Sequence, residues 1–275
     1  MNTVAIGLPK GGVGKTTVSI NLADRLAARG HDVLLVDLDQ QGGSTEGLGQ
    51  EALYTADEHV GDVLRGEIAP GRLIQPRTET IPFDLIASHR DLNRTAMAIG
   101  EGTTIAASIE RKLLDPLDGR YDWVLFDSPP TIGPLSNATF RAGRRIVVPV
   151  LMSEPSLRSL SKLVTQQLVP INADVDVEIV AIVPNRLSGD NEERRVLSAI
   201  ENSEYGSVLP HFARTARIDE DGPGPGIRER IAIRRATREA IPLGSYDPES
   251  DMLERFDALA AIVERRGVRR RRVTG

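Results

Sequence analysis

The chain has 275 residues, of which 40% are hydrophobic and 27% are charged. This composition is ordinary for a globular protein and excludes disordered, collagen-like and coiled-coil chains. Cysteine is absent, which excludes disulfide scaffolds, thiolate metal sites and cysteine nucleophiles and agrees with a reducing, cytoplasmic compartment. No apolar run approaches the roughly 20 residues that span a bilayer, and no signal-peptide pattern is visible.

The formal net charge of −5 is unevenly distributed. Residues 265–275 contain six arginines and no acidic residue, so the rest of the chain is markedly acidic. We expect residues 266–275 to form a basic, disordered tail that contacts phosphates nonspecifically, attracts an acidic partner or keeps the protein soluble. No linker interrupts the preceding segment, so residues 1–265 are predicted to form a single domain.

Apolar runs alternate with helical patterns from the first residues onward. Strands are predicted at residues 3–8, 32–37, 83–87, 123–126, 145–150 and 177–183. Helices are predicted at residues 15–29, 57–66, 105–115, 134–142, 156–168 and 191–202. Because continuous apolar strands between helices are typical of sheets buried on both faces, the fold class predicted is α/β, with a doubly wound, mainly parallel sheet flanked by helices.

A glycine-rich segment connects the first predicted strand to the first predicted helix. Its glycines let successive backbone N–H groups point inward at phosphate oxygens, and the helix that follows adds the positive end of its dipole. Lys15 is placed to reach the β- and γ-phosphates, and the Thr16 hydroxyl to bind Mg²⁺. The predicted nucleotide-binding residues are Lys10, Gly11, Gly12, Val13, Gly14, Lys15, Thr16 and Thr17.

The ordinary P-loop pattern requires glycine where this chain has Pro9, whereas the variant with a second lysine before the glycines fits completely. The segment therefore resembles the ParA/MinD family of deviant Walker A ATPases. Asp37 to Gly43 (DLDQQGG) resembles the second motif of that family, and Val124 to Pro130 (VLFDSPP) resembles its Walker B segment. The resemblance implies an ATPase with ATP and Mg²⁺ as cofactors, and motifs that converge at the carboxyl ends of the strands.

The resemblance also implies roles for individual residues. Lys10, Lys15 and Asp39 would be catalytic, with Asp39 positioning or polarising the attacking water. Thr16, Asp37 and Asp127 would form the metal site, in which Asp37 supports the Thr16 hydroxyl and Asp127 holds Mg²⁺ through a water. Taken singly, Asp37 or Asp39 is as compatible with a helix cap or turn. Lys10 would reach the ATP of a second subunit, which implies a homodimer with ATP at its interface.

Two further positions follow from the same resemblance. Asn185 would read the adenine edge through its amide, and Pro210 would flank the base; an asparagine turn is the alternative for Asn185. The family usually has proline where this chain has Gln40 and asparagine where it has Gly43. These departures predict a more mobile loop after Asp39 and leave open a scaffold that binds ATP and barely hydrolyses it.

The later part of the chain resembles the ParA branch, which segregates chromosomes, plasmids or other cargo. That branch implies nonspecific DNA binding, nucleoid association and a ParB-like adaptor or activator. The candidate DNA-binding residues are Arg214, Arg217, Arg228, Arg230, Arg234, Arg235 and Arg238. Residues 211–240, which contain these seven arginines, also contain five acidic residues. The alternative is therefore a solvated helix face whose arginines form salt bridges.

Two other classes are disfavoured. A MinD-like membrane protein needs a carboxyl-terminal amphipathic helix that binds the membrane. An apolar stripe near the carboxyl terminus is predicted to pack on the core instead, so no stable membrane association is expected. The stripe consists of Met252, Leu253, Phe256, Leu259, Ile262 and Val263. Metal-trafficking P-loop ATPases need cysteine, and the four histidines lie far apart in the sequence without metal spacing (His31, His59, His89 and His211).

Overall fold

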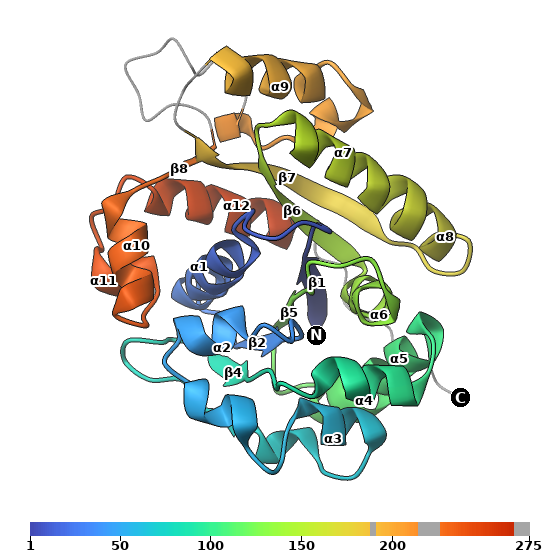
Figure 1. Cartoon of the computed structure of the whole chain (residues 1–275). Coiled ribbons are helices and arrows are strands. Elements are labelled where there is room, and N and C mark those ends of the chain that lie inside the picture. The colour runs from blue at the N-terminus through green and yellow to red at the C-terminus, as the bar shows by residue number, and fades with distance from the viewer. Residues whose placement is uncertain (188–190, 214–225, 267–275) are drawn as a thin grey trace.

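The computed structural model describes residues 1–187, 191–213 and 226–266. Eight strands form one sheet in the order β3-β4-β2-β5-β1-β6-β7-β8 (Figure 1). All pairs are parallel except β3 with β4, which is antiparallel. The strands are β1 (Asn2–Ile6), β2 (Val33–Asp37), β3 (Ile74–Gln75), β4 (Asp84–Ile86), β5 (Trp123–Asp127), β6 (Arg145–Leu151), β7 (Glu178–Leu187) and β8 (Ile227–Arg228).

Helices cover both faces of this sheet, so the expected doubly wound α/β fold is confirmed. The α-helices are α1 (Lys15–Ala28), α2 (Gly43–Gly47), α3 (Val60–Arg65), α4 (Leu92–Ile99), α5 (Gly102–Ser108), α6 (Pro134–Gly143), α7 (Glu154–Lys162), α8 (Val169–Ile171), α9 (Asn191–Glu201), α10 (Ile231–Arg238), α11 (Leu243–Tyr246) and α12 (Leu253–Arg265). Helices α1 and α12 lie on one face beside α10 and α11, whereas α5, α6, α7 and α8 lie on the other (Figure 1).

All six predicted strands are present within a few residues of their expected bounds. β2 and β5 are buried along their whole length, as expected for central strands of a parallel sheet. The prediction missed β3 and β8 because two residues carry no periodic pattern, and it missed α4. The helices predicted at 105–115 and 156–168 each continue from an α-helix into a π-helical segment, at residues 109–114 and 163–168.

The carboxyl-terminal helix α12 packs against α1 and β7. Its side chains Phe256, Leu259 and Val263 are fully buried. The apolar stripe therefore forms part of the core, which confirms the expected docking. Within the described ranges, no helix is both long and apolar enough to cross a membrane.

Two histidines that lie 30 positions apart in the chain are in contact. The rings of His59 and His89 stack with centroids 3.9 Å apart and planes 2° from parallel. The Nδ1 of His59 accepts the N–H of Gly61 at 3.0 Å, and the Nδ1 of His89 accepts the N–H of Asp91 at 3.1 Å. The two histidines are thus close in space although they lie far apart in the sequence, and both rings serve as backbone caps near the starts of α3 and α4.

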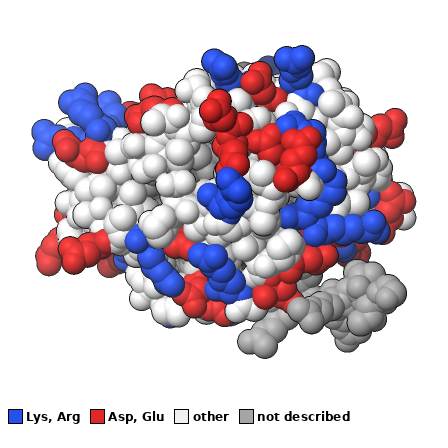
Figure 2. All heavy atoms as spheres, turned by 90° about the horizontal axis from the view of Figure 1, so that it is seen from below, with Lys and Arg blue, Asp and Glu red and all other residues white. Residues whose placement is uncertain are grey.

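Basic and acidic side chains are interspersed on the face seen in Figure 2. Exposed ion pairs occur among the described residues, such as Arg72 with Glu58 at 2.6 Å. Among the residues that the structure describes, this face offers no uniformly basic surface to a polyanion.

Candidate functional site

The predicted site residues of the amino-terminal half meet at the carboxyl ends of β1, β2 and β5. In the sheet, Asp127 pairs with Ile6 on one side and with Asp37 on the other. The two aspartates therefore lie side by side on neighbouring strands, immediately below the loop that leaves β1. Parallel pairing explains this convergence, because residues far apart in sequence reach the same edge of the sheet.

The loop between β1 and α1, predicted to bind phosphates, forms a glycine turn, which we call the phosphate-binding turn. Gly12 and Gly14 adopt φ values of 73° and 91°, in the left-handed region that glycine occupies without steric cost. Helix α1 begins directly after them at Lys15, so its first N–H groups point into the same turn. Lys15 is buried, with 6% of its surface exposed, and its Nζ donates to the carbonyl of Lys10 at 3.4 Å. The turn thus presents backbone donors and one cation to a single point.

Asp127 accepts two hydroxyl hydrogen bonds on one oxygen. Thr16 Oγ1 donates to Asp127 Oδ2 at 2.9 Å, and Ser44 Oγ donates to the same atom at 2.8 Å. The sequence assigned support of the Thr16 hydroxyl to Asp37; the structure gives that contact to Asp127 instead. The prediction fails because the two carboxylates are neighbours at the same level of the sheet, and only the side-chain geometry decides between them.

Asp37 instead holds the segment that follows Asp39. Its Oδ2 accepts the Thr45 N–H at 2.9 Å and the Thr45 hydroxyl at 2.8 Å, and its Oδ1 accepts the Asp39 N–H at 3.1 Å. Burial and the neighbouring charge of Asp127 raise the pKa of Asp37 to about 8, although the Thr45 hydrogen bonds oppose the shift. Asp37 therefore fixes the backbone that presents Asp39.

Asp39 is nearly buried, with 8% of its surface exposed. Its Oδ1 accepts the Gln41 N–H at 2.9 Å, and its carbonyl accepts the Ser88 hydroxyl at 2.6 Å. Burial raises the pKa of the Asp39 carboxyl, while the Gln41 N–H and the charge of Lys15 lower it. The loop after Asp39 is also anchored, since the Tyr54 hydroxyl donates to the Gln40 carbonyl at 2.6 Å.

The residues around Asp127 fit a hydrated Mg²⁺ ion. Asp127 is fully buried and its Oδ1 has no hydrogen-bond partner among the described residues, an arrangement that costs free energy unless a cation or water completes it. Burial raises the pKa of Asp127, and Lys15 and the two hydroxyl donors oppose that rise. A carboxylate and a threonine hydroxyl are oxygen ligands of the kind that Mg²⁺ takes beside phosphates. Asp127 and Thr16 are therefore the residues that would hold the ion.

Lys10 lies on the other side of the loop. Its Nζ donates to Ser156 Oγ at 2.7 Å, and Ser156 in turn is 3.0 Å from Ser153 Oγ. Ser156 is fully buried near the start of α7. The side chain of Lys10, the additional lysine of the motif, is thus directed toward α7.

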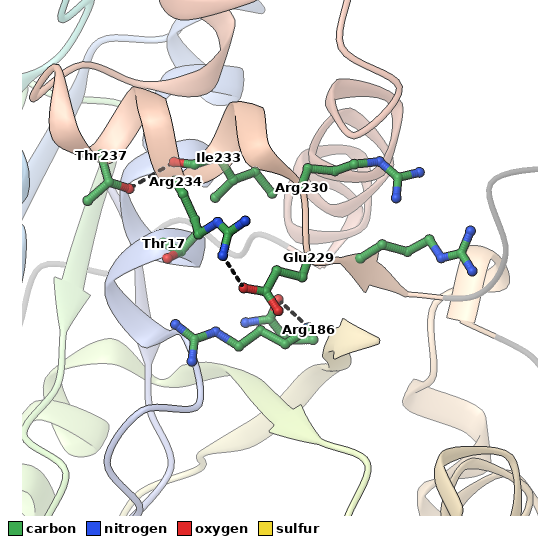
Figure 3. A pocket seen from close by; sticks show the side chains of 9 residues that line it. Thr17, Arg186, Glu229, Arg230, Ile233, Arg234 and Thr237 are labelled. Carbon is green, nitrogen blue, oxygen red and sulfur yellow. Dashed lines mark hydrogen bonds and ion pairs between the residues drawn. The ribbon is translucent and has the colours of Figure 1, made fainter. Parts of the chain in front are cut away.

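Asn185 and several predicted arginines line one pocket of about 220 Å³, which we call the arginine pocket (Figure 3). Thr17 of α1 and Asn185 of β7 form one side, and residues of the β8–α10 segment form the other. Its four guanidinium groups are those of Arg186, Arg228, Arg230 and Arg234. Arg230 pairs with Asp251 at 2.5 Å, and Arg234 pairs with Glu229 at 3.4 Å. Three of the predicted DNA-binding arginines, Arg228, Arg230 and Arg234, therefore line the same pocket as Thr17, a predicted nucleotide-binding residue.

The remaining predicted residues are distributed differently. Arg235 and Arg238 are exposed on α10, outside the lining of the arginine pocket, and Arg214 and Arg217 lie outside the described residues. Pro210 lines a separate pocket with Val180 near the start of β7. Asn185 lines the arginine pocket and not this one. That Asn185 and Pro210 both flank one base stays a prediction.

Comparisons with known proteins identify the family of this chain. A family model described as an AAA domain matches residues 1–177. The sporulation initiation inhibitor protein Soj of Bacillus subtilis is 30% identical over 275 residues, which covers 96% of this chain and 98% of the relative. The chromosome-partitioning protein ParA of Caulobacter vibrioides is 32% identical and covers 81% of this chain and 85% of the relative. The chain belongs to the ParA/MinD family of P-loop ATPases.

Solved structures show the same fold. A plasmid partition protein of Borrelia burgdorferi bound to AMPPNP has a TM-score of 0.76 at 18% identity, covering 96% of this chain and 99% of that one. Cobyrinic acid a,c-diamide synthase of Mycobacterium smegmatis, with a bound ATP analogue and magnesium, has a TM-score of 0.73 at 23% identity and covers 96% and 94%. ATP and Mg²⁺, the cofactors predicted from the sequence, are those of the ParA/MinD family.

Sequence reasoning missed four hydroxyl residues that organise this ParA/MinD site, namely Ser44, Thr45, Ser88 and Ser156. Ser88 directly follows a predicted strand, so the rule that sites form at strand carboxyl ends could have found it. Ser44 and Thr45 lie just past the motif at Asp37–Gly43. Nothing in the pattern around Ser156 signals its contact with Lys10, because α7 and the loop are 146 residues apart.

Proposed function

We propose that this chain is a ParA-type partition ATPase whose Mg²⁺-ATP-bound dimer binds DNA nonspecifically and positions or segregates cargo. The observation that carries the ATPase proposal is the meeting of Lys15, Thr16 and Asp127 below a glycine turn, with Asp127 Oδ1 left without a hydrogen-bond partner. Relatives named for chromosome partitioning, Soj and ParA, favour partition as the use of ATP.

Each residue of the site then has a defined task. The loop amides and Lys15 neutralise and orient the phosphates, which is most of what phosphoryl transfer requires of a protein. Thr16 and Asp127 hold Mg²⁺, which supplies charge neutralisation at the phosphates when it is bound. Asp39 orients the attacking water and accepts its proton, since burial raises its affinity for that proton. Asp37 and Ser88 hold the backbone of Asp39 in place.

Asp39→Ala tests the hydrolytic role. Without the carboxylate the attacking water loses its base, so we expect ATP-bound dimers to accumulate while nucleotide binding persists. Phosphate release and sedimentation with Mg²⁺-ATP measure the two effects. Turnover equal to that of the unaltered protein would remove Asp39 from the mechanism.

Dimerisation is proposed to depend on Lys10. Its long stem carries a compact charge that can bridge two subunits, and release from Ser156 would let it reach the ATP of the partner. Lys10→Ala should therefore leave ATP binding by the monomer near its original affinity and abolish ATP-driven dimers. Sedimentation velocity with ATP and ADP measures this, and dimers of the variant at unchanged concentration would refute the role.

DNA binding is proposed for the arginines of the β8–α10 segment. Electrophoretic shift of a random-sequence duplex with ATP, ADP and no nucleotide tests the proposal. We expect binding with ATP only, weakening as salt rises because it rests on phosphate contacts. Equal binding with ADP, or none at low salt, would contradict the proposal, and pelleting with anionic vesicles would then identify a MinD-like protein.

The same proposal places ATP-bound dimers on the nucleoid and requires a ParB-like adaptor that stimulates hydrolysis. Hydrolysis would return monomers that release DNA, so the nucleotide state sets where the protein resides. A membrane-free location agrees with the buried stripe of α12. The assay measures phosphate release and its cargo-dependent stimulation by a basic segment of the partner.

A further inference from the structure

A stacked pair of histidines has no part in the site described above. The ring of His89 is almost fully buried, with 3% of the residue exposed, and it stacks on the ring of His59 at the start of α3. The His59 ring is confined in turn, since a Cβ built at Gly61 would lie 2.6 Å from its Cε1. The pair is thus enclosed by the fold, and the residues beside it indicate what it holds in place.

One neighbour of His89 belongs to a closed ring of hydrogen bonds around Asp39. Ser88 donates its N–H to Thr45 Oγ1 at 2.8 Å and its hydroxyl to the Asp39 carbonyl at 2.6 Å. The Thr45 hydroxyl and the Asp39 N–H both donate to the carboxylate of Asp37, which closes the ring. The position of Asp39 therefore depends on the position of Ser88.

The other neighbour of His89 holds the same loop at a second point. The Arg90 N–H donates to the Tyr54 carbonyl at 3.2 Å, and the Tyr54 hydroxyl donates to the Gln40 carbonyl at 2.6 Å. The rings of Tyr54 and His89 also lie near each other, with centroids 6.5 Å apart. Displacement of His89 would therefore loosen the loop after Asp39 at two points.

Both histidine rings are built into the fold in the neutral form. The Nδ1 of each ring accepts a backbone N–H, that of Gly61 for His59 and that of Asp91 for His89, so the ring proton is assigned to Nε2. A second proton on His89 would go to Nδ1 and face the Asp91 N–H. The Asp91 carboxylate, 3.9 Å from this nitrogen, is the acceptor that the charged ring would take, and reaching it requires the turn to rearrange.

The surroundings of His89 favour its neutral form. Burial lowers the pKa of His89 below its usual 6.5; the charges of His59 and Arg90 act in the same direction, whereas those of Asp91 and Asp62 oppose them. The native turn is therefore favoured above about pH 6.5 and becomes less so as the pH falls below that value. The other charged groups around His59 form ion pairs, Arg65 with Asp62 and Glu67 and Arg72 with Glu58.

We infer that His89 is a positioning residue for ATP hydrolysis: it holds the turn at residues 88–91 against the loop after Asp39 and releases that loop when the histidine pair takes up a proton. This rests on the proposed ATPase function. The phosphates are bound by the phosphate-binding turn and Lys15, so mild acid should lower the rate of hydrolysis through His89 without an equal loss of ATP affinity.

The experiment measures kcat for phosphate release and the Kd of Mg²⁺-ATP between pH 5.5 and 8. For the unaltered protein we expect kcat to fall about threefold from pH 7.5 to 5.5, as for a histidine that titrates below 6.5. His89→Asn keeps an oxygen that can accept the Asp91 N–H and cannot titrate, so it should lose most of this fall. His31→Gln removes a histidine that bonds Glu264 of α12 and should retain it.

An equal acid fall in His89→Asn would assign the titration to the Asp39 carboxylate and overturn the inference. His59→Phe, which keeps a ring against His89, serves if the asparagine variant unfolds. Its acid fall should move to higher pH because the charge of His59 no longer opposes a proton on His89, and an unmoved fall would contradict the inference.

NMR of the nucleotide-free protein gives a readout that does not depend on hydrolysis. The amide signals of Asp39 and Thr45 should shift with the same midpoint as the ring of His89, and that midpoint should vanish from them in His89→Asn. Amide signals that ignore the titration of His89 would overturn the inference. Absence of hydrolysis at every pH would instead overturn the proposed ATPase function, a failure that these amide signals distinguish.

Discussion

The two ends of the candidate nucleotide site are built on different physical principles. At the phosphate end, Asp37 and Asp127 are fully buried, and three of their four carboxylate oxygens are hydrogen-bonded. At the arginine pocket, the charges lie near solvent; the side chains of Arg234 and Glu229 are 66% and 54% exposed. Buried charges without partners are costly, whereas exposed pairs contribute about 0–1 kcal/mol. The phosphate end is therefore fixed in geometry, and the arginine pocket is adjustable.

This difference suits two separate proposed functions, ATP hydrolysis at the phosphate end and DNA binding at the arginine pocket. Preorganised donors in a buried site suit chemistry, because they need no rearrangement as charge develops. Weak, exposed ion pairs suit a surface that exchanges intramolecular acids for DNA phosphates when conditions change. The predictions below test this division.

Lys15→Ala should have the largest effect. Lys15 is buried between the loop and Asp127, so its removal takes away the main cation that meets the phosphates. We expect ATP affinity to fall by about 100-fold or more, equivalent to roughly 3 kcal/mol for a charge-assisted contact. Calorimetry measures the loss. Lys162→Ala, on the exposed part of α7, is the control, and an affinity within threefold of the original for Lys15→Ala would refute the assignment.

Asp37→Asn should change how stability depends on pH in Mg²⁺-free buffer. Burial raises the pKa of Asp37 from its usual 3.8 to about 8, so the folded protein keeps a proton that the unfolded chain loses. Stability from this group is thus complete below about pH 4 and falls as pH rises to about 8, by up to roughly 1.4 kcal/mol per pH unit. Asp37→Asn should remove this dependence of the unfolding free energy on pH.

Urea unfolding with EDTA at several pH values from 5 to 8 measures this effect. Asp57→Asn, at an exposed position, should retain the slope of the unaltered protein. Identical slopes for the original protein and Asp37→Asn would show that Asp37 does not carry a proton in the folded state.

The same division explains what the sequence could predict. The strands follow from apolar runs, and the Lys10–Thr17 motif follows from residue types that phosphate binding requires at fixed spacing. The strand order brings Asp37 and Asp127 together, which the rule about strand carboxyl ends anticipates. Their exchange of roles at the Thr16 hydroxyl depends on side-chain geometry within a few ångström, and no spacing rule carries that information.

At the arginine end the sequence was less informative. Seven arginines with similar neighbours could not be ranked, because a helix face that pairs with acids and one that binds DNA have the same composition. The structure separates Arg235 and Arg238, exposed on α10, from Arg228, Arg230 and Arg234 in the arginine pocket. The Lys10–Ser156 contact and the position of Pro210 depend on packing between distant segments, which local patterns do not encode.

Arg235→Ala combined with Arg238→Ala should weaken DNA binding without affecting ATP affinity. The two side chains are exposed on α10 and lie outside the pocket lining. We expect about tenfold weaker DNA binding at low salt and a salt dependence reduced by about one unit of slope per lost phosphate contact. Fluorescence anisotropy across a salt series measures both. Arg94→Ala with Arg111→Ala removes two exposed arginines elsewhere; an equal loss in that control would contradict a surface on α10.

Glu229→Gln should have the smallest effect and the opposite sign. Glu229 pairs with Arg234 at 3.4 Å in a solvent-exposed position, so removing its charge releases the guanidinium at little cost to the fold. DNA affinity should rise about two- to threefold at low salt, and the gain should vanish as screening increases. Glu239→Gln changes the same charge at the exposed end of α10 and separates a general charge effect from release of Arg234. Equal gains in both variants would mean that the Arg234–Glu229 pair does not restrain the arginine, and that the adjustable end of the site is set by net charge alone.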